Sequence, residues 1–350
     1  MTRFSISVPV GAYHPLLPTC LESLARQGEG VEVSLLDASG DKRVFDLAEK
    51  FASLFAYRRH GPDEGQSAAI IEGWMHTAGE ILGWLNADDF LFPGSIRKAR
   101  AVFASNARTD VVAGHSAICD EQGRMTGYHW AVEAPGDNLR AGCVISQPSC
   151  FFRRAAYEKA GGLDAALHYT MDWDLWLRLL ESGAKFHFID DVLSVVYWGE
   201  GTKTLGMKPR RRAELMRLID LYTPAHLKFR ARRGFHLRAM LDEMRPQAFS
   251  RFIEARLRRR VPTVFGLGPR GALSSEAEII WTHYDAAPKS VLSIETEGDV
   301  SFRASLPLAK AEAGESGLIL TFAAPVASGE IARITLNSRG RARLIRCGWK

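Results

Sequence analysis

Two adjacent carboxylates, Asp88 and Asp89, directly follow an apolar run that begins at Ile81. Carboxylates this close repel one another, and burial favours their protonated form, so water, a cation or a helix terminus must compensate the pair. A simpler interpretation places both residues in a solvated loop, where they cap the helix that the turn at 93–95 introduces. The stretch GWLNADDFLFPG, residues 83–94, is compatible with both interpretations.

Two further carboxylates occupy the ends of predicted elements. Asp37 ends the apolar stretch VEVSLLD, and Asp172 lies in the first turn of the amphipathic segment TMDWDLWLRLLESG, which Gly183 terminates. An acid in a first helical turn is stabilised by the helix dipole whatever its function. Asp174 illustrates this, because Arg178 lies four residues on and is expected to pair with it on the exposed side of the helix.

The elements that position these residues alternate between short apolar runs and helical stretches. Strands are predicted over 4–10, 31–37, 55–59 and 80–85, and helices over 17–27, 42–51, 65–77 and 97–103. This alternation predicts an α/β fold with a mostly parallel sheet flanked by helices. The segment 110–130 is typical of a strand, a turn and a returning strand, which makes the sheet mixed. Ligands of such sheets bind beyond the carboxyl ends of the strands, where Asp37, Asp88 and Asp89 lie.

The later part of the chain changes in character. Between Lys203 and Arg260 there are 17 Lys and Arg against 5 Asp and Glu, and the pattern is helical from Lys208. From Pro262 onward, short runs rich in β-branched residues are broken by Gly, Pro and acidic turns, which predicts a small β-sandwich. We therefore expect three parts, with boundaries at 1–205 for the α/β domain, 206–260 for a basic helical segment and 261–350 for a small all-β domain.

Composition limits the class of protein. The 350 residues are 46% hydrophobic and 24% charged, the net charge is +5, and five cysteines are widely spread without a CxxC pair. These features predict a globular protein with reduced thiols, as in the cytoplasm. The N-terminus MTRFSISVPV is too short and too alternating for a signal peptide, and no run approaches the roughly 18 apolar residues of a membrane span. Any membrane contact is therefore expected to be peripheral, at the inner face of the membrane.

Six stretches, in order, resemble the glycosyltransferase family 2 proteins. They cover roughly residues 4–205 and read SISVPV, LESLARQ, VSLLDASGD, GPDEGQSAAIIEGWMHTAGEILGWLNADD, QPSCFFRRAAYEKAGGLDAALHYTMDWDLWLRL and GTKT. The resemblance implies the GT-A fold, in which an α/β sheet binds a nucleotide sugar. It also implies an inverting glycosyltransferase that moves a sugar from a nucleoside diphosphate donor, typically a UDP-sugar, to a hydroxyl acceptor in polysaccharide or glycoconjugate biosynthesis.

The resemblance assigns the acidic strand end to a divalent metal, Mn²⁺ or Mg²⁺, that bridges the two phosphates of the donor. By position, Asp89 is similar to the metal ligand, and Asp88 to the residue that contacts the ribose or shares the metal. A bound cation stabilises the charge that develops on a diphosphate leaving group. Asn86 stands where many relatives carry another Asp, so this chain has one negative charge fewer.

The resemblance also assigns the nucleotide pocket. Asp37 matches the acid that accepts a hydrogen bond from the base, with a helix cap as its alternative role. The other residues assigned to the nucleotide sugar are Pro9, Val10, Tyr13, Asp63 and Gln66. The family's aromatic-Asn pair falls on Gly11 and Ala12 here, so Tyr13 or His14 would have to pack on the base.

Asp172 is similar to the family's catalytic base, although the usual Glu-Asp reads Met171 and Asp172 in this chain. The acceptor side is assigned to Gln147, Pro148 and Trp173. Relatives often carry a His before their Ser-Lys-Thr, and this chain has Gly199 there, which puts its metal affinity in question.

Two alternatives remain at this stage. A nucleotidyltransferase would carry a Gly-rich loop ending in Arg after its first strand, and VPVGAYHPLL does not. A non-catalytic scaffold that binds nucleotide sugars or carbohydrate is the other, and the β-domain would then bind carbohydrate through Trp281 or Tyr284 unless these residues serve packing.

The expected partners are a nucleotide-sugar donor and a saccharide or lipid-linked saccharide acceptor. The basic segment is either a solvated helical face or a surface attracted to anionic membrane lipid. Nucleic acid is not expected as a partner, because no recognised motif accompanies the charge.

Overall fold

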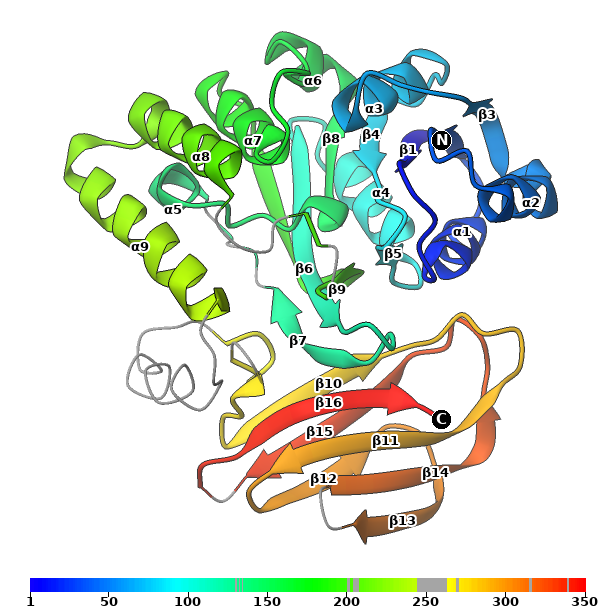
Figure 1. Ribbon diagram of the computed structural model, residues 1–350. Coiled ribbons are helices and arrows are strands. Elements are labelled where there is room, and N and C mark those ends of the chain that lie inside the picture. The colour runs from blue at the N-terminus through cyan, green and yellow to red at the C-terminus, as the bar shows by residue number, and fades with distance from the viewer. Residues whose placement is uncertain are drawn as a thin grey trace.

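The computed structural model describes residues 1–129, 131, 133, 135–199, 202–203, 208–243, 263–268, 271–314, 317–338 and 340–350. An α/β part and a β-sandwich make up the molecule, and the sandwich lies beneath the helices and the main sheet in Figure 1.

The first half of the main sheet is parallel, as the alternating pattern predicts. Its strands follow the order β3-β2-β1-β4, and each neighbouring pair is parallel. The elements are β1 (Phe4–Val10), α1 (Leu17–Ala25), β2 (Val31–Asp37), α2 (Lys42–Lys50), the short 3-10 helix η1 (Ala52–Leu54), β3 (Phe55–His60), α3 (Gln66–Met75) and β4 (Ile81–Trp84). The carboxyl ends of these strands therefore share one edge of the sheet.

The two faces of β1 carry different side chains. Phe4, Ile6, Val8 and Val10 pack in one hydrophobic cluster with residues of α1, α2 and α4 (Ser95–Ser105). The intervening serines face α3, where the Ser7 hydroxyl donates to the Ile70 carbonyl at 3.0 Å. Small groups are needed on this face, because a Cβ on Gly73 would lie 2.9 Å from Leu36 Cδ2. This close approach packs α3 directly against β1 and β2.

The second half of the sheet is mixed, which confirms the predicted fold class. Strands β4 and β6 both run antiparallel to β8, and β9 runs parallel to β6. The elements are β5 (Phe90–Leu91), β6 (Val111–Cys119), β7 (Met125–His129), α5 (Gly136–Ala141), η2 (Gln147–Ser149), β8 (Cys150–Arg153), α6 (Arg154–Lys159), α7 (Met171–Glu181) and β9 (Phe186–Tyr197). The predicted hairpin at 110–130 corresponds to β6 and β7.

The described part of the basic segment forms two helices, α8 (Pro209–Tyr222) and α9 (Ala225–Glu243). They lie beside α5 and α7 in Figure 1. Leu215, Leu218 and Ile219 of α8 are buried in the same cluster as the apolar face of α7. Residues 244–260 of the predicted segment lie outside the described residues. In the described residues, no helix is long and apolar enough to cross a membrane.

The C-terminal region is a two-sheet β-structure, as its short β-branched runs predict. One sheet has the order β13-β14-β11-β16, and the other has β10-β15-β12. The strands are β10 (Glu276–Trp281), β11 (Lys289–Glu297), β12 (Val300–Ala304), β13 (Leu308–Gly314), β14 (Gly317–Val326), β15 (Ala332–Ser338) and β16 (Arg343–Trp349). Pairing of Cys347 in β16 with Met125 in β7 joins the larger sheet to the main sheet.

Buried polar contacts anchor the sandwich to the α/β part. The Tyr128 hydroxyl accepts the Ile280 amide at 2.8 Å and donates to the Glu278 carbonyl at 3.1 Å. The Tyr284 hydroxyl donates to the Leu91 carbonyl at 2.8 Å. Trp281 is 2% exposed, and Tyr284 is also buried. The suggestion that these two rings bind carbohydrate is therefore wrong, since packing at the junction covers both of them.

Candidate functional site

A cavity of about 1210 Å³ opens at the carboxyl ends of β1 and β4. It extends from the start of α3 past the N-terminal end of α7 to α8 and α9. Of the residues predicted for the site, those on its wall are Pro9, Val10, Tyr13, Asp63, Gln66, Asp88, Asp89, Gln147, Pro148, Asp172 and Trp173. Residues predicted for donor, metal and acceptor thus share one cavity, although they come from segments distant in sequence.

The acidic pair lies on this wall directly after β4. Asp89 is buried, and its carboxylate accepts the Tyr197 amide and the Asn86 side-chain amide, each at 3.1 Å. Burial raises the pKa of Asp88. Burial, and then the charge of Asp88, raise the pKa of Asp89 well above its usual range. Two carboxyls with raised pKa values at a cavity wall are suited to a cation that compensates their charge.

A chain of side-chain amides connects the acidic pair to the far side of the cavity. Lys203 Nζ donates to Gln66 Oε1 at 2.9 Å, and Gln66 Nε2 donates to Asn86 Oδ1 at 2.8 Å. Asn86 then donates to Asp89, as described above, and its amide also lies 3.3 Å from Gln147 Oε1. Gln147 in turn donates to the Trp84 carbonyl at 2.7 Å. The Asn86 amide therefore connects both halves of the cavity. An ionised Asp at this position could not replace it, because a carboxylate has no N–H to donate to Asp89 and Gln147.

The nucleotide end of the cavity is built by β1 and the loop after it. Arg43 covers one face of the Tyr13 ring, with its guanidinium carbon 3.9 Å from the ring centroid. His14 packs edge-on against Tyr197, with ring centroids 4.6 Å apart. Burial lowers the pKa of His14, although the charge of Asp88 opposes this shift. Only the uncovered face of Tyr13 is therefore open to a planar ligand.

Asp37 is the one predicted site residue that does not line the cavity. It pairs in register with Val10 on one side and His60 on the other, one strand away from the wall. Its buried carboxylate accepts the Ser39 amide at 2.9 Å and the Ser39 hydroxyl at 2.5 Å, and it lies 2.8 Å from His60 Nδ1. In this structure Asp37 organises the turn after β2, and its contact with a base stays a prediction.

Asp172 lies in the first turn of α7, on the cavity wall. Its carboxylate accepts the Trp173 amide at 2.7 Å. Burial raises the pKa of Asp172, while that amide and the charges of Lys203 and Arg211 oppose the shift. A carboxylate held at a helix N-terminus, with a pKa above its usual range, suits a general base.

The loop before Asp172 is held by Glu214 of α8. The Glu214 carboxylate accepts the backbone amides of His168, Tyr169 and Thr170 at 3.0, 2.7 and 3.2 Å. Sequence patterns did not identify this anchor, because the contact spans more than forty residues.

The predicted Asp174–Arg178 ion pair forms, with contacts of 2.8 and 2.6 Å. The prediction that it lies on an exposed face is wrong, since Asp174 is only 6% exposed. Arg178 also donates to the Ala160 carbonyl at 2.6 Å, which ties α7 to the end of α6. This carboxylate stabilises the fold and does not line the cavity.

Three cationic residues on the cavity wall were not singled out from the sequence. Lys203 lies near Asp172, and Arg211 and Arg230 line the end formed by α8 and α9. Burial lowers the pKa of Lys203, whereas the charges of Glu214 and Asp172 oppose that shift. The 17-to-5 charge count between Lys203 and Arg260 was the available signal, but it did not indicate which side chains face inward.

Within the described residues, no group of three or more His, Cys, Asp or Glu side chains is arranged to hold a metal ion. Asp88 and Asp89 nevertheless fit one common arrangement. Mg²⁺ is often bound by one or two carboxylates, while substrate phosphates and water supply its other ligands. A Cβ on Gly199 would lie 2.7 Å from a Glu121 carboxylate oxygen, so a His there would require neighbouring side chains to move.

Comparisons with known proteins agree with this geometry. The model of Glycosyl transferase family 2 matches residues 5–161. A PGL/p-HBAD biosynthesis glycosyltransferase of Mycobacterium bovis is 28% identical over 186 residues, which cover 52% of this chain and 71% of that protein.

Two solved structures of Staphylococcus aureus TarS share the fold. The structure of TarS 1–349 in complex with UDP-GlcNAc has a TM-score of 0.52 at 18% identity, and the match covers 71% of this chain and 75% of that one. A second TarS structure has a TM-score of 0.52 at 12% identity and covers 98% of this chain and 77% of that one, so the likeness includes the β-sandwich. Residues 5–161 thus match glycosyl transferase family 2, the fold is of the GT-A type, and the protein is a glycosyltransferase.

Proposed function

We propose that the protein transfers a sugar, with inversion, from a UDP-sugar to a hydroxyl group of a saccharide or lipid-linked saccharide. The observation that carries this proposal is that Asp88, Asp89 and Asp172 line the same cavity. UDP-GlcNAc in the TarS complex supports a uridine nucleotide as donor. The mycobacterial relative is named for PGL/p-HBAD biosynthesis, which supports an acceptor in glycoconjugate biosynthesis.

In the donor half, Asp88 and Asp89 would hold a divalent metal, Mn²⁺ or Mg²⁺, whose positive charge stabilises the departing diphosphate. Asn86 orients Asp89 through its side-chain amide. Pro9, Val10 and Tyr13 form the wall for the nucleoside, and Asp63 and Gln66 close it from α3. We leave Asp37 out of this contact set, because Ser39 and His60 already engage its buried carboxylate.

In the acceptor half, Asp172 removes the proton from the acceptor hydroxyl as its oxygen attacks the anomeric carbon. Burial supports this role, because the raised pKa makes the carboxylate a stronger base than an exposed Asp. Gln147, Pro148 and Trp173 border the space beside it. Attack from the side opposite the diphosphate gives the inverted product.

A thermal-shift experiment tests the donor assignment. UDP with Mn²⁺ at about 100 times its Kd should add about 2.7 kcal/mol of stability, and UDP with a chelator should add less. If GDP with Mn²⁺ raises Tm and UDP does not, the uridine assignment is wrong. Release of UDP from UDP-sugars in the presence of parent enzyme separates catalysis from a scaffold, which would bind the nucleotide without turnover.

A peripheral membrane contact is the second proposed property, and the exposed side of α8 and α9 supports it. Leu221 is 62% exposed and Phe229 is 75% exposed, although both are large apolar residues. Three basic residues lie on the same helix as Phe229. Arg232 and Arg233 are exposed, and Lys228 is half-buried. Apolar side chains among basic ones are typical of surfaces that bind anionic lipid.

A further inference from the structure

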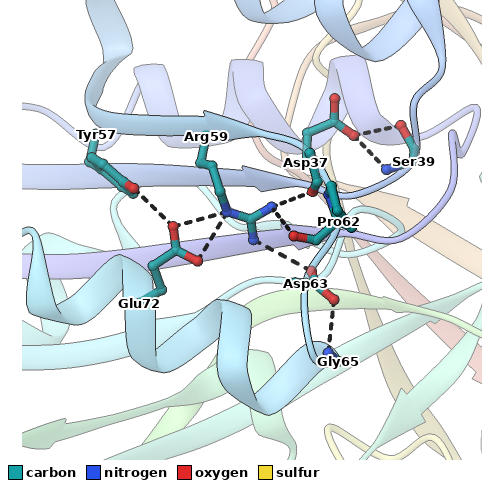
Figure 2. Close-up of polar contacts among 9 residues, drawn as sticks. Asp37, Ser39, Tyr57, Arg59, Pro62, Asp63, Gly65 and Glu72 are labelled. Carbon is teal, nitrogen blue, oxygen red and sulfur yellow. Dashed lines mark hydrogen bonds and ion pairs between the residues drawn. The ribbon is translucent and has the colours of Figure 1, made fainter.

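Arg59 at the end of β3 joins that strand, α3 and the loop between them into one polar network (Figure 2). Arg59 Nε donates to both carboxylate oxygens of Glu72, at 2.9 and 3.0 Å. The Tyr57 hydroxyl donates to the same carboxylate at 2.8 Å. Glu72 therefore fixes the guanidinium from the α3 side.

The other side of the guanidinium faces the loop at 61–65. Arg59 Nη1 donates to the carbonyl of Gly61, and it lies 3.3 Å from that of Pro62. Arg59 Nη2 lies 3.6 Å from Asp63 Oδ2. The second Asp63 oxygen accepts the Gly65 amide at 2.8 Å, immediately before α3 begins at Gln66.

These contacts end at two residues of the donor half. Asp63 and Gln66 line the cavity, whereas Arg59 does not. Gln66 is the residue that links Lys203 to Asn86 and thus to the acidic pair. Gly65 has a φ of +114°, a conformation that favours glycine. Because glycine has no side chain, this position of the turn is not held by a side-chain contact of its own. Arg59 contacts this loop at Gly61, Pro62 and Asp63.

We propose that Arg59 is a positioning residue for donor binding, which holds the loop at 61–65 so that Asp63 and Gln66 face the nucleotide sugar. The inference rests on the proposed function, since it needs a nucleotide in this cavity. Arg59 Nη2 is buried and has no hydrogen-bond partner among the described residues. A loop shift of about 0.5 Å toward Nη2 on donor binding would turn the 3.6 Å contact with Asp63 into a hydrogen bond.

Arginine is required for this role because of its shape. A guanidinium presents five N–H donors in a planar fork, whereas a lysine amine is a compact point charge on a flexible stem. Lysine at position 59 keeps the charge beside Glu72 but cannot reach Glu72, the two loop carbonyls and Asp63 together. Arg59→Lys therefore separates the positioning of the loop from the ion pair that stabilises the fold.

The adjacent Arg58 provides a matched control. It lies one residue earlier on β3, so its side chain points to the opposite face of the strand. Arg58 pairs with Glu49 of α2 at 2.7 Å and donates to the Ala48 carbonyl at 3.3 Å. Arg58→Met removes a similar charge and length from the same strand without a contact to the loop at 61–65.

The experiment measures UDP affinity, with Mn²⁺ present, by calorimetry on the full chain. Arg59→Met and Arg59→Lys should each weaken UDP binding about 10-fold, which corresponds to about 1.4 kcal/mol. Arg58→Met should stay within about twofold of the parent, as expected for a residue outside the network. In turnover assays the donor KM should rise, while kcat and the acceptor KM remain near those of the parent.

A double-mutant cycle tests whether Arg59 acts through Asp63. Asp63→Asn and Arg59→Lys should be non-additive in UDP affinity, because the double variant has no pair left to lose. Additive effects, or parental affinity in Arg59→Lys, would overturn the inference. Failure of the proposed function looks different: in that case the parent itself does not bind UDP, and if it binds no nucleotide at all, both proposals are wrong.

Discussion

Substitution of Asp172 by Asn separates the catalytic carboxylate proposed here from a carboxylate that only stabilises its helix. Asn preserves the size of the side chain and its oxygen for the Trp173 amide, which lies 2.7 Å from the Asp172 carboxylate. It cannot take up the acceptor's proton. We expect kcat to fall by the roughly 10² to 10⁴ that general-base loss costs, or about 2.7 to 5.4 kcal/mol of barrier.

The change in stability caused by Asp172→Asn should have a different sign from the change caused by loss of an ordinary contact. Burial raises the pKa of Asp172 in the folded state, so its stabilising contribution is complete below the unfolded pKa and is lost as pH rises through the folded value. At neutral pH the ionised group thus costs the fold stability. Removal of that charge should leave Tm unchanged or higher.

Asp174 on the same helix turn is the matched control. It is buried in an ion pair with Arg178, and both contacts are shorter than 3 Å. Asp174→Asn should cost about 1.5 to 3 kcal/mol of stability, as expected for hydrogen bonds to a charged group. Its kcat should remain close to that of the parent, because Asp174 does not line the cavity.

The assay measures UDP release with acceptor present, UDP affinity and Tm for both variants. The pH profile supplies a second readout. Because Asp172 must be ionised, kcat/KM of the parent should decline on acidification at a pH above 3.8, the ordinary pKa of an Asp, and Asp172→Asn should lack this limb. Near-parental turnover in Asp172→Asn, or loss of turnover confined to Asp174→Asn, would refute the assignment of the base.

Three further outcomes are expected. Asp89→Ala should lose the Mn²⁺-dependent part of the Tm increase caused by UDP, and an unchanged increase would remove Asp89 from the metal site. Lys203→Met should weaken binding of UDP more than that of uridine, because an amine beside the donor half attracts phosphate charge; equal loss for both ligands would instead indicate a purely structural role. The double variant Leu221→Ser, Phe229→Ser should sediment less with anionic vesicles than the parent does, and parental binding should weaken as salt rises; equal recovery with neutral and anionic vesicles would contradict the membrane contact.

Local patterns in the sequence were sufficient for much of the α/β part. All seven residues of β1 are buried, and the strand spans Phe4–Val10 as its apolar run predicts. The hairpin of β6 and β7 was equally clear, since turn residues at 121–123 separate two strand-like segments. By contrast, β9 was not predicted, because Asp190 and Asp191 interrupt its pattern and its pairing with β6 shifts register at His115.

The resemblance of six ordered stretches identified the acidic pair and Asp172, because motifs retain residue type and spacing. Motifs do not specify how far a side chain lies from a cavity. Asp37 has the expected residue type at the expected strand end, yet Ser39 and His60 engage its carboxylate beside the cavity. The Trp281 ring is aromatic and suited to sugars in isolation, but β10 packs it into the core.

The sequence by itself therefore determined most of the elements, their order and the candidate residues for the chemistry, since these depend on periodicities of two and 3.6 residues and on short motifs. Tertiary structure alone decided which distant groups meet. Lys203 contacts Gln66 across 137 positions, and Tyr128 contacts Ile280 across 152. Such contacts depend on how whole helices and strands pack, and a shift of one strand register or one helical turn would separate the groups without any change in local pattern.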